Sequence, residues 1–294
     1  MNLVFHQAAL GDFALILPLL RGLDGPTTLV APWSRGRLAS ALIDNVSAMD
    51  IELFEFSRLH SDDGPHTLSP AVKELFDAAE AVISFVAEES DPWAEHVVRL
   101  APQCNLVCLD TRPAPESPGS SHAHITEWHR ERLLSFGIAV NEVDIKPTGD
   151  PNGPIVIHPG SGGRDKCWPR DRFESLIEAC REKNHPVRVI FGEAEAARWP
   201  QHVLERWHDR YHAVGCGSLE LLVEQLMGAS AYVGNDAGPT QLAAQLGLPT
   251  TALFGPTDPS VWAPRGPSVR VIAPPEAAEM EWLSVDHVVS EVLG

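Results

Sequence analysis

The stretch VGNDAGPTQLAAQLGLPTTALFGPTDP, residues 233–259, decides the fold of this chain. An apolar run over residues 229–234 predicts a strand, and an acidic turn follows over residues 235–238. An Ala- and Leu-rich helix is predicted over residues 239–246, and after a Gly-Leu-Pro break residues 250–254 predict a second strand. This strand–helix–strand unit indicates a parallel sheet.

Asp236 and Gly238 lie in the turn between the first of these strands and the helix. Open parallel sheets bind ligands at the carboxyl ends of their strands. The first N–H groups of a helix are unpaired there, so they can meet an anion or a hydroxyl. The alternative is that Asp236 only caps the helix.

The same alternation of strands and helices runs through both halves of the chain, which predicts two parallel sheets, each covered on both faces. Residues 141–154 contain three prolines and two glycines, a composition typical of a domain boundary. We therefore expect two α/β domains that resemble Rossmann folds, over residues 1–147 and 148–294. A last helix is expected over residues 282–293.

Composition narrows the class of protein. The net charge of −18 argues against nonspecific nucleic-acid binding and against docking on a membrane through a broad basic face. Five cysteines without a C-x-x-C pair argue against a disulfide scaffold or a zinc site, and they favour the cytoplasm. The chain starts without a basic leader and contains no apolar run of about 18 residues, so neither a signal peptide nor a membrane span is expected.

Three turns carry candidate chemistry. Asp12 follows the first predicted strand, where a carboxylate can act as a general base towards a hydroxyl; an N-cap role is the alternative. Residues 158–169, HPGSGGRDKCWP, form a glycine-rich turn before a helix, which suits a phosphate and supplies Lys166 as a point charge, although the turn lacks the Walker A spacing. Glu195 follows a later strand and would hold a ribose hydroxyl or favour the start of a helix.

Three longer segments together resemble glycosyltransferase family 9, the heptosyltransferase family. They are ALGDFALILPLLRGL at residues 9–23, HPGSGGRDKCWPRDRF at 158–173 and GNDAGPTQLAAQLGLPTTALFGPTDP at 234–259. The resemblance covers the C-terminal half and about the first 25 residues, and residues 45–145 are shorter and more divergent. It implies an α/β protein of the GT-B fold, in which two Rossmann-like domains face a central cleft and the last helix packs back on the first domain.

The resemblance also implies an activity: inverting, metal-independent transfer of a sugar, with heptose from ADP-heptose as the expected donor, onto a lipopolysaccharide-type or other glycan acceptor. No cofactor beyond the nucleotide-sugar donor is expected. Asp12 matches the family's catalytic aspartate and Lys166 the lysine that neutralises the donor diphosphate. Ser161 and Gly162 match phosphate-binding positions, and residues 216–218 would border the base. A lipid-linked acceptor would bring the protein to the inner membrane as a peripheral protein.

The remaining donor-binding positions follow the same resemblance. Asp236, Ala237 and Gly238 match an Asp-Thr-Gly turn that holds the donor's sugar and phosphates, and Glu195 is a looser match to a ribose-binding glutamate. Gln241 replaces a histidine that heptosyltransferases usually carry, and glutamine cannot become a cation. Two alternatives therefore stay open: a nucleotide-sugar epimerase or hydrolase on the same scaffold, and a non-catalytic nucleotide-binding relative.

Overall fold

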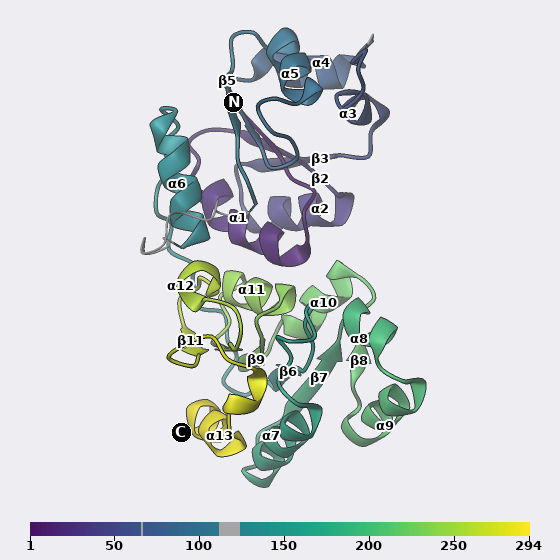
Figure 1. Cartoon of the computed structure of the whole chain (residues 1–294), viewed down its shortest axis with the longest axis vertical. Coiled ribbons are helices and arrows are strands. Elements are labelled where there is room, and N and C mark those ends of the chain that lie inside the picture. The colour runs from purple at the N-terminus through teal and green to yellow at the C-terminus, as the bar shows by residue number, and fades with distance from the viewer. Residues whose placement is uncertain (66, 112–123) are drawn as a thin grey trace. The chain divides into compact units, whose positions relative to one another are not determined.

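The computed structural model describes residues 1–65, 67–111 and 124–294. Its internal contacts divide the chain into two units, Met1–Val143 and Asp144–Gly294. Each unit is built on a parallel sheet with helices on both faces (Figure 1). Within the described residues, no helix combines the length and the apolar character that crossing a bilayer requires.

The sheet of the first unit has the strand order β3-β2-β1-β4-β5, and every pair is parallel. The strands are β1 (Asn2–Phe5), β2 (Thr27–Ala31), β3 (Val46–Asp50), β4 (Ala81–Ser84) and β5 (Asn105–Cys108). The helices are α1 (Leu10–Gly22), α2 (Trp33–Leu42), α3 (Phe54–Arg58), α4 (Pro70–Ala78), α5 (Pro92–Leu100) and α6 (Ile125–Ser135).

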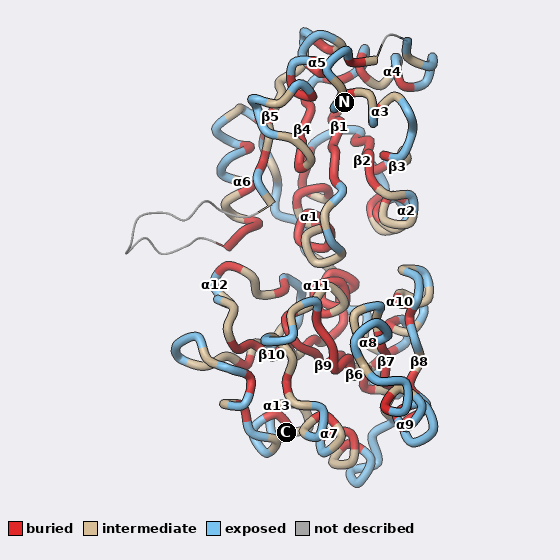
Figure 2. The backbone as a smooth tube through the Cα atoms, turned by 45° about the vertical axis from the view of Figure 1, so that its right-hand side comes forward, coloured by how far each residue is buried: buried red, intermediate tan, exposed pale blue. Residues whose placement is uncertain are grey.

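Successive side chains along each strand of the first unit point alternately into two separate hydrophobic cores. In β1, Val4 belongs to one hydrophobic cluster, whereas Leu3 and Phe5 belong to the other. Successive side chains of a strand point to opposite faces, so each face of the sheet has its own core under its own helices. The inner strands β1, β2 and β4 are accordingly buried along their whole length, whereas the edge strands β3 and β5 are only partly buried (Figure 2).

The sheet of the second unit has the order β11-β10-β9-β6-β7-β8, again with parallel pairs. Its strands are β6 (Ile155–His158), β7 (Val187–Phe191), β8 (Val214–Gly215), β9 (Ala231–Asn235), β10 (Thr250–Leu253) and β11 (Val269–Ile272). Its helices are α7 (Arg170–Glu182), α8 (Glu193–Arg198), α9 (Gln201–Tyr211), α10 (Leu219–Leu226), α11 (Gly238–Gln245), α12 (Pro259–Trp262) and α13 (Val285–Leu293), with a 3₁₀ turn at Met280–Trp282.

In each sheet, successive strands of the chain are added first on one side and then, after one point, on the other side. The reversal falls between β1 and β4 in the first unit and between β6 and β9 in the second, where the order matches that of the dinucleotide-binding Rossmann sheet. At such a point the connections leave the two strands towards opposite faces, and ligands bind beside the carboxyl ends. The fold therefore predicts one ligand-binding position in each unit, beside the carboxyl ends of these strands.

Two helices differ from the sequence-based expectation. Residues 194–207 were expected to form one helix, but α8 ends at Arg198 and α9 begins at Gln201, because Pro200 between them has no N–H to donate. The last helix begins at Val285, where the Ser284 hydroxyl accepts from a backbone N–H of its first turn. This helix was expected to return to the first domain, whereas the structure places it in the second unit, packed on α7.

Candidate functional site

Two of the predicted turns leave the second sheet side by side. Strands β6 and β9 are paired, with His158 opposite Gly234 in the register, so the glycine-rich turn and the acidic turn emerge next to each other. Lys166 Nζ lies 2.7 Å from Asp236 Oδ2. Ser161 Oγ donates to the backbone carbonyl of Asp236 at 2.8 Å. The structure thus brings together a cation, a hydroxyl and a carboxylate that are about 70 residues apart in the chain.

A third loop joins this cluster. The hydroxyl of Thr257, in the loop between β10 and α12, donates to Asp236 Oδ2 at 2.9 Å. The carboxylate of Asp236 is nearly buried and accepts from both Thr257 and Lys166. The capping alternative for Asp236 is therefore wrong: the N-cap residue of α11 is Ala237, and no side chain caps this helix.

Asn235, one residue earlier, holds the two turns together. Its side chain is fully buried. The side-chain oxygen accepts from the backbone N–H of Trp168 at 2.9 Å, and the side-chain nitrogen donates to the carbonyls of Pro159 at 3.0 Å and Gly160 at 3.2 Å. An amide that satisfies three backbone groups of a neighbouring loop fixes the path of that loop. Gly162 is exposed in the same turn, and Gly238 is the first residue of α11.

Glu195 ties the third predicted turn to the first. Its carboxylate accepts from the Gly192 N–H at 2.7 Å and lies 3.2 Å from His158 Nε2. Burial alone would raise the pKa of Glu195, but the hydrogen bond and charge interaction with His158, together with backbone N–H donors, lower it. A side chain at Gly160 would collide with this carboxylate, because a Cβ there would lie 1.7 Å from Glu195 Oε1.

The helix-start alternative for Glu195 is confirmed, since its carboxylate lies in the first turn of α8 and accepts from the N–H of the N-cap residue Gly192. Only 3% of its surface is exposed. Its expected contact with a ribose stays a prediction.

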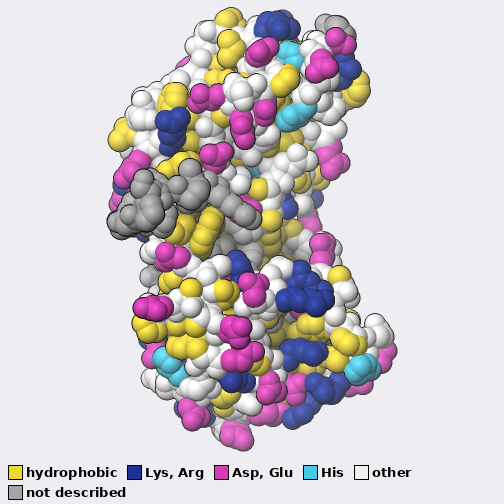
Figure 3. Space-filling model, in the orientation of Figure 1, with side chains coloured by type: hydrophobic (Ala, Val, Ile, Leu, Met, Phe, Trp, Pro, Cys, Tyr) yellow, Lys and Arg dark blue, Asp and Glu magenta, His cyan; other side chains and the backbone are white. Residues whose placement is uncertain are grey.

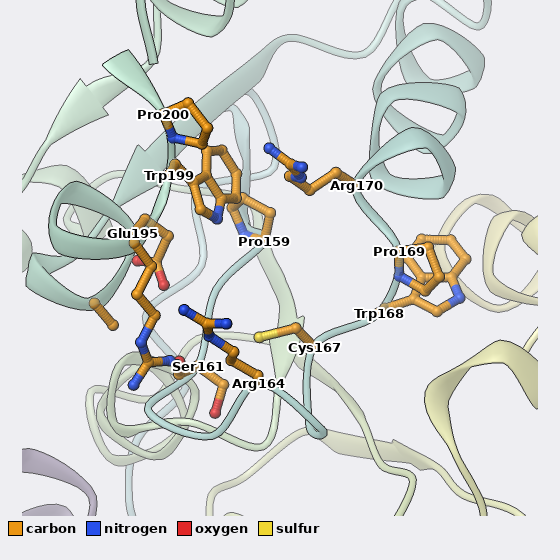
Figure 4. Close-up of a pocket in the computed structure, with 12 residues that line it drawn as sticks. Pro159, Ser161, Arg164, Cys167, Trp168, Pro169, Arg170, Glu195, Trp199 and Pro200 are labelled. Atoms are coloured by element: carbon orange, nitrogen blue, oxygen red, sulfur yellow. Dashed lines mark hydrogen bonds between the residues drawn. The ribbon is translucent and has the colours of Figure 1, made fainter. Parts of the chain in front are cut away.

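A pocket of about 300 Å³ lies beside the glycine-rich turn, against α8 and the residues that follow it (Figure 4). Ser161 and Glu195 line it, and so do the guanidinium groups of Arg164, Arg170 and Arg198. Arginine clusters favour anionic groups. Lys and Arg side chains gather on this face of the second unit (Figure 3).

Arg198 acts on the backbone of the turn. Its guanidinium donates to the carbonyl of Ser161 at 3.0 Å and to the carbonyl of Gly162. Arg170 instead stacks over the Trp199 ring, with 5.1 Å between the guanidinium carbon and the ring centroid. The sequence-based analysis assigned no role to either arginine. Arg170 directly follows the glycine-rich turn, whereas only the fold brings Arg198 on α8 to that turn.

Gln241 is turned into the protein. It is 3% exposed, and its side-chain nitrogen donates to the carbonyl of Trp262 at 2.7 Å. One turn later Gln245 makes the equivalent contact with the carbonyl of Arg265, also at 2.7 Å. The contact of Gln241 with a donor stays a prediction, and its observed partner is the end of α12.

In the first unit, Asp12 lies in the first turn of α1, which begins at Leu10 rather than at Asp12 as expected. The N-cap is Ala9, so the capping alternative for Asp12 is wrong. A carboxylate in a first helical turn interacts favourably with the helix dipole. Arg35 is close enough to interact with the charge of Asp12: burial lowers the pKa of Arg35, and Asp12 opposes that shift.

Three histidines lie near one another in the sequence, at positions 122, 124 and 129. His122 lies outside the described residues. His124 caps α6 by accepting from the Thr126 N–H, and the ring of His129 contacts the carbonyl of Asp110 at 2.8 Å. Among the residues that the structure describes, no three His, Cys, Asp or Glu side chains are placed to hold a metal ion together.

Comparison with known proteins shows which protein family this chain resembles. The model of glycosyltransferase family 9 (heptosyltransferase) matches residues 134–285. The chain is 32% identical over 168 residues to lipopolysaccharide heptosyltransferase 1 of Pseudomonas aeruginosa, which is 57% of this chain and 42% of that protein. It is 26% identical over 116 residues to lipopolysaccharide heptosyltransferase 3 of Escherichia coli, or 37% of this chain and 33% of that protein. The matched stretches thus span less than half the length of these curated relatives.

Solved structures share the fold over nearly the whole chain. The Escherichia coli heptosyltransferase WaaC with ADP superposes with a TM-score of 0.69 at 19% identity, covering 99% of this chain and 98% of that one. The Escherichia coli ADP-heptose lps heptosyltransferase II gives a TM-score of 0.62 at 17% identity, covering 99% and 97%.

The two parallel α/β units therefore form the GT-B fold that the resemblance implied. Because the family model matches more than half of the chain, the chain belongs to glycosyltransferase family 9.

Proposed function

We propose that this chain transfers heptose from ADP-heptose to a glycan acceptor of the lipopolysaccharide type, with inversion at the sugar carbon and without a metal. The observation that carries the proposal is the convergence of Lys166, Ser161 and the start of α11 at the strand-order reversal between β6 and β9. Relatives named as lipopolysaccharide heptosyltransferases, and a similar structure with ADP, agree with this donor and acceptor.

The second unit would hold the donor. The N–H of Gly238 at the start of α11 and the ammonium of Lys166 supply positive potential for a diphosphate, together with the dipole of the helix. The glycine-rich turn offers backbone N–H groups around Ser161 and Gly162 without the obstruction of side chains. These groups would stabilise the negative charge that grows on the leaving nucleoside diphosphate, which is the kind of electrostatic preorganisation that dominates many active sites.

The first unit would supply the base. As the acceptor oxygen bonds to the anomeric carbon, the acceptor's hydroxyl proton passes to the carboxylate of Asp12. The bond between the anomeric carbon and the phosphate oxygen breaks, and ADP leaves with the electron pair. An acceptor linked to lipid would bring the protein to the inner membrane from the cytoplasm as a peripheral protein.

The test is transfer of heptose by the full chain, with Asp12→Asn as the decisive variant. We expect this variant to lose transfer by roughly 10²- to 10⁴-fold, the usual contribution of a general base. Its ADP affinity, measured by calorimetry, should stay that of the wild type. Asp44→Asn is the matched control, because Asp44 is an exposed carboxylate of the same unit.

Three outcomes contradict the proposal in different ways. Full transfer by Asp12→Asn removes the base assignment. Turnover of ADP-heptose to free sugar or to an epimer without acceptor favours the epimerase or hydrolase alternative. Absence of binding to any nucleoside diphosphate near millimolar concentration favours a non-catalytic relative.

A further inference from the structure

A small cavity lies at the strand-order reversal of the first sheet. It is lined from three directions: by His6 just after β1, by Phe85 just after β4, and by His129 on α6, with Asp12 and other α1 residues beside them. The volume open to the centre of a water molecule is about 10 Å³. A cavity needs roughly 10–15 Å³ by this measure to hold one water.

The imidazole of His6 is the unexplained group in this cavity. His6 is fully buried, and its ring lies 6.0 Å from the Phe13 ring and 5.6 Å from the Phe85 ring. Neither ring nitrogen has a hydrogen-bond partner within the described part of the chain. Buried polar atoms without protein partners are rare because they are costly, and a buried water commonly satisfies them.

His129 presents a second open nitrogen to the same cavity. The ring is 2% exposed, and its Nδ1 has no partner among the described residues. Its Nε2 lies 2.8 Å from the carbonyl oxygen of Asp110, which can only accept. Nε2 must therefore carry the proton, and in a neutral ring Nδ1 is then an acceptor.

We propose that this cavity holds one ordered water that hydrogen-bonds His6 and His129 and joins them to Asp12, which makes the two histidines positioning residues for that carboxylate. The positioning role rests on the proposed function, in which Asp12 is the base. The hydrogen bonds balance: the water donates to Nδ1 of His129 and to the Asp12 carboxylate, and it accepts from an N–H of His6. Buried waters typically make about three such bonds.

The charges around the cavity keep both rings neutral. Burial, then Arg35 on α2 and His129 on α6, lowers the pKa of His6 to about 3. Burial lowers the pKa of His129 to about 4, against the opposing effect of Asp110 and with a further lowering by His124. Two neutral rings can hold an ordered water without adding positive charge beside Asp12, which already interacts with the guanidinium of Arg35.

The proposal is tested by structure and kinetics together. A high-resolution crystal structure should show one water within hydrogen-bond distance of both rings. Nitrogen-15 NMR of the histidine rings should show His129 protonated at Nε2 and both rings neutral at pH 6. An empty cavity, or a charged His6 at that pH, overturns the water relay whatever the activity is.

The kinetic arm uses paired variants. His6→Leu should lower kcat by roughly tenfold, the loss expected for one orienting hydrogen bond, with an unchanged KM for ADP-heptose. His6→Asn, which can still donate, should recover part of that loss, and His60→Leu, at an exposed position, should be neutral. If Asp12→Asn is inactive and His6→Leu keeps full kcat, the positioning role is wrong. If Asp12→Asn is fully active, Asp12 is not the base. The crystal structure and the NMR spectra then decide alone whether the cavity holds the water.

Discussion

The ammonium of Lys166 lies 2.7 Å from one carboxylate oxygen of Asp236, and that same oxygen accepts from Thr257. The lysine side chain is 32% exposed and the aspartate side chain 10%. The cation expected to meet the donor diphosphate is therefore already oriented by a carboxylate from the next loop. A lysine has three N–H donors, so it can keep this contact and still donate to a phosphate oxygen.

Replacing Lys166 by Met should weaken ADP binding by roughly 10- to 100-fold, because a charge-assisted hydrogen bond is lost and Asp236 keeps its negative charge near the phosphates. Calorimetry with ADP measures the change. Lys183→Met is the control, since Lys183 is exposed at the end of α7. Equal affinities for the wild type and Lys166→Met would mean that the diphosphate binds elsewhere.

Replacing Arg198 by Lys should release one carbonyl of the glycine-rich turn, because a lysine cannot make the forked contact with Ser161 and Gly162. We expect nucleotide affinity to fall by about 3- to 10-fold, the worth of one ordinary hydrogen bond. Arg206→Lys, on the exposed face of α9, should change nothing. A loss of kcat with unchanged nucleotide affinity would show that the turn is not held for the nucleotide.

Comparing variants of two glutamines of α11, Gln241 and Gln245, distinguishes a structural role of Gln241 from a contact with the donor. Gln241→Leu and Gln245→Leu each leave a carbonyl without its partner, so each should lower the free energy of unfolding by about 1–3 kcal/mol. Chemical denaturation measures this. If Gln241 also touches the donor, only its variant should weaken ADP-heptose binding; equal affinities for both variants would reject that contact.

Acid should destabilise the first unit well above the pH at which carboxylates titrate. The pKa of His6 is lowered from 6.5 to about 3 and that of His129 from 6.5 to about 4, mainly by burial. Between these values and 6.5 the unfolded chain binds protons that the folded chain does not, so stability falls as the pH falls. Each histidine contributes about 1.4 kcal/mol per pH unit in that window.

His6→Gln should remove the contribution of His6, so the free energy of unfolding should fall less steeply between pH 6.5 and pH 4. The exposed His60→Gln is the matched control. An unchanged slope in His6→Gln would mean that His6 takes up its proton in the folded protein.

Local patterns were sufficient for the alternation of strands and helices and for the edge where the chemistry gathers. Short continuous apolar runs predicted the burial of strands such as β1 on both faces, and Gly and Pro marked the turns. The partners of each turn were not predictable in the same way. Arg198 reaches Ser161 across 37 residues, and Thr257 reaches Asp236 across 21, so only the strand order brings them together.

The capping alternatives for Asp12 and Asp236 fail for a common reason. An acidic residue before an apolar helix reads as a cap, but both helices use an alanine at the N-cap position, and Asp12 lies within its helix. The extra turn at the start of α1 comes from Leu10 and Gly11, which carry no capping signal. Pro200, by contrast, is visible in the sequence as a helix break. The helical spacing of the residues on either side of it nevertheless favoured one continuous helix.

The indole of Trp199 lies at the break between α8 and α9, stacked under Arg170 and in edge contact with Phe191 and Trp207. It also borders the arginine-lined pocket (Figure 4). An anion that draws Arg170 away from the ring changes the electrostatic environment of an intrinsic fluorophore. A titration of the intrinsic fluorescence with an anion is therefore expected to follow the filling of this pocket without any label.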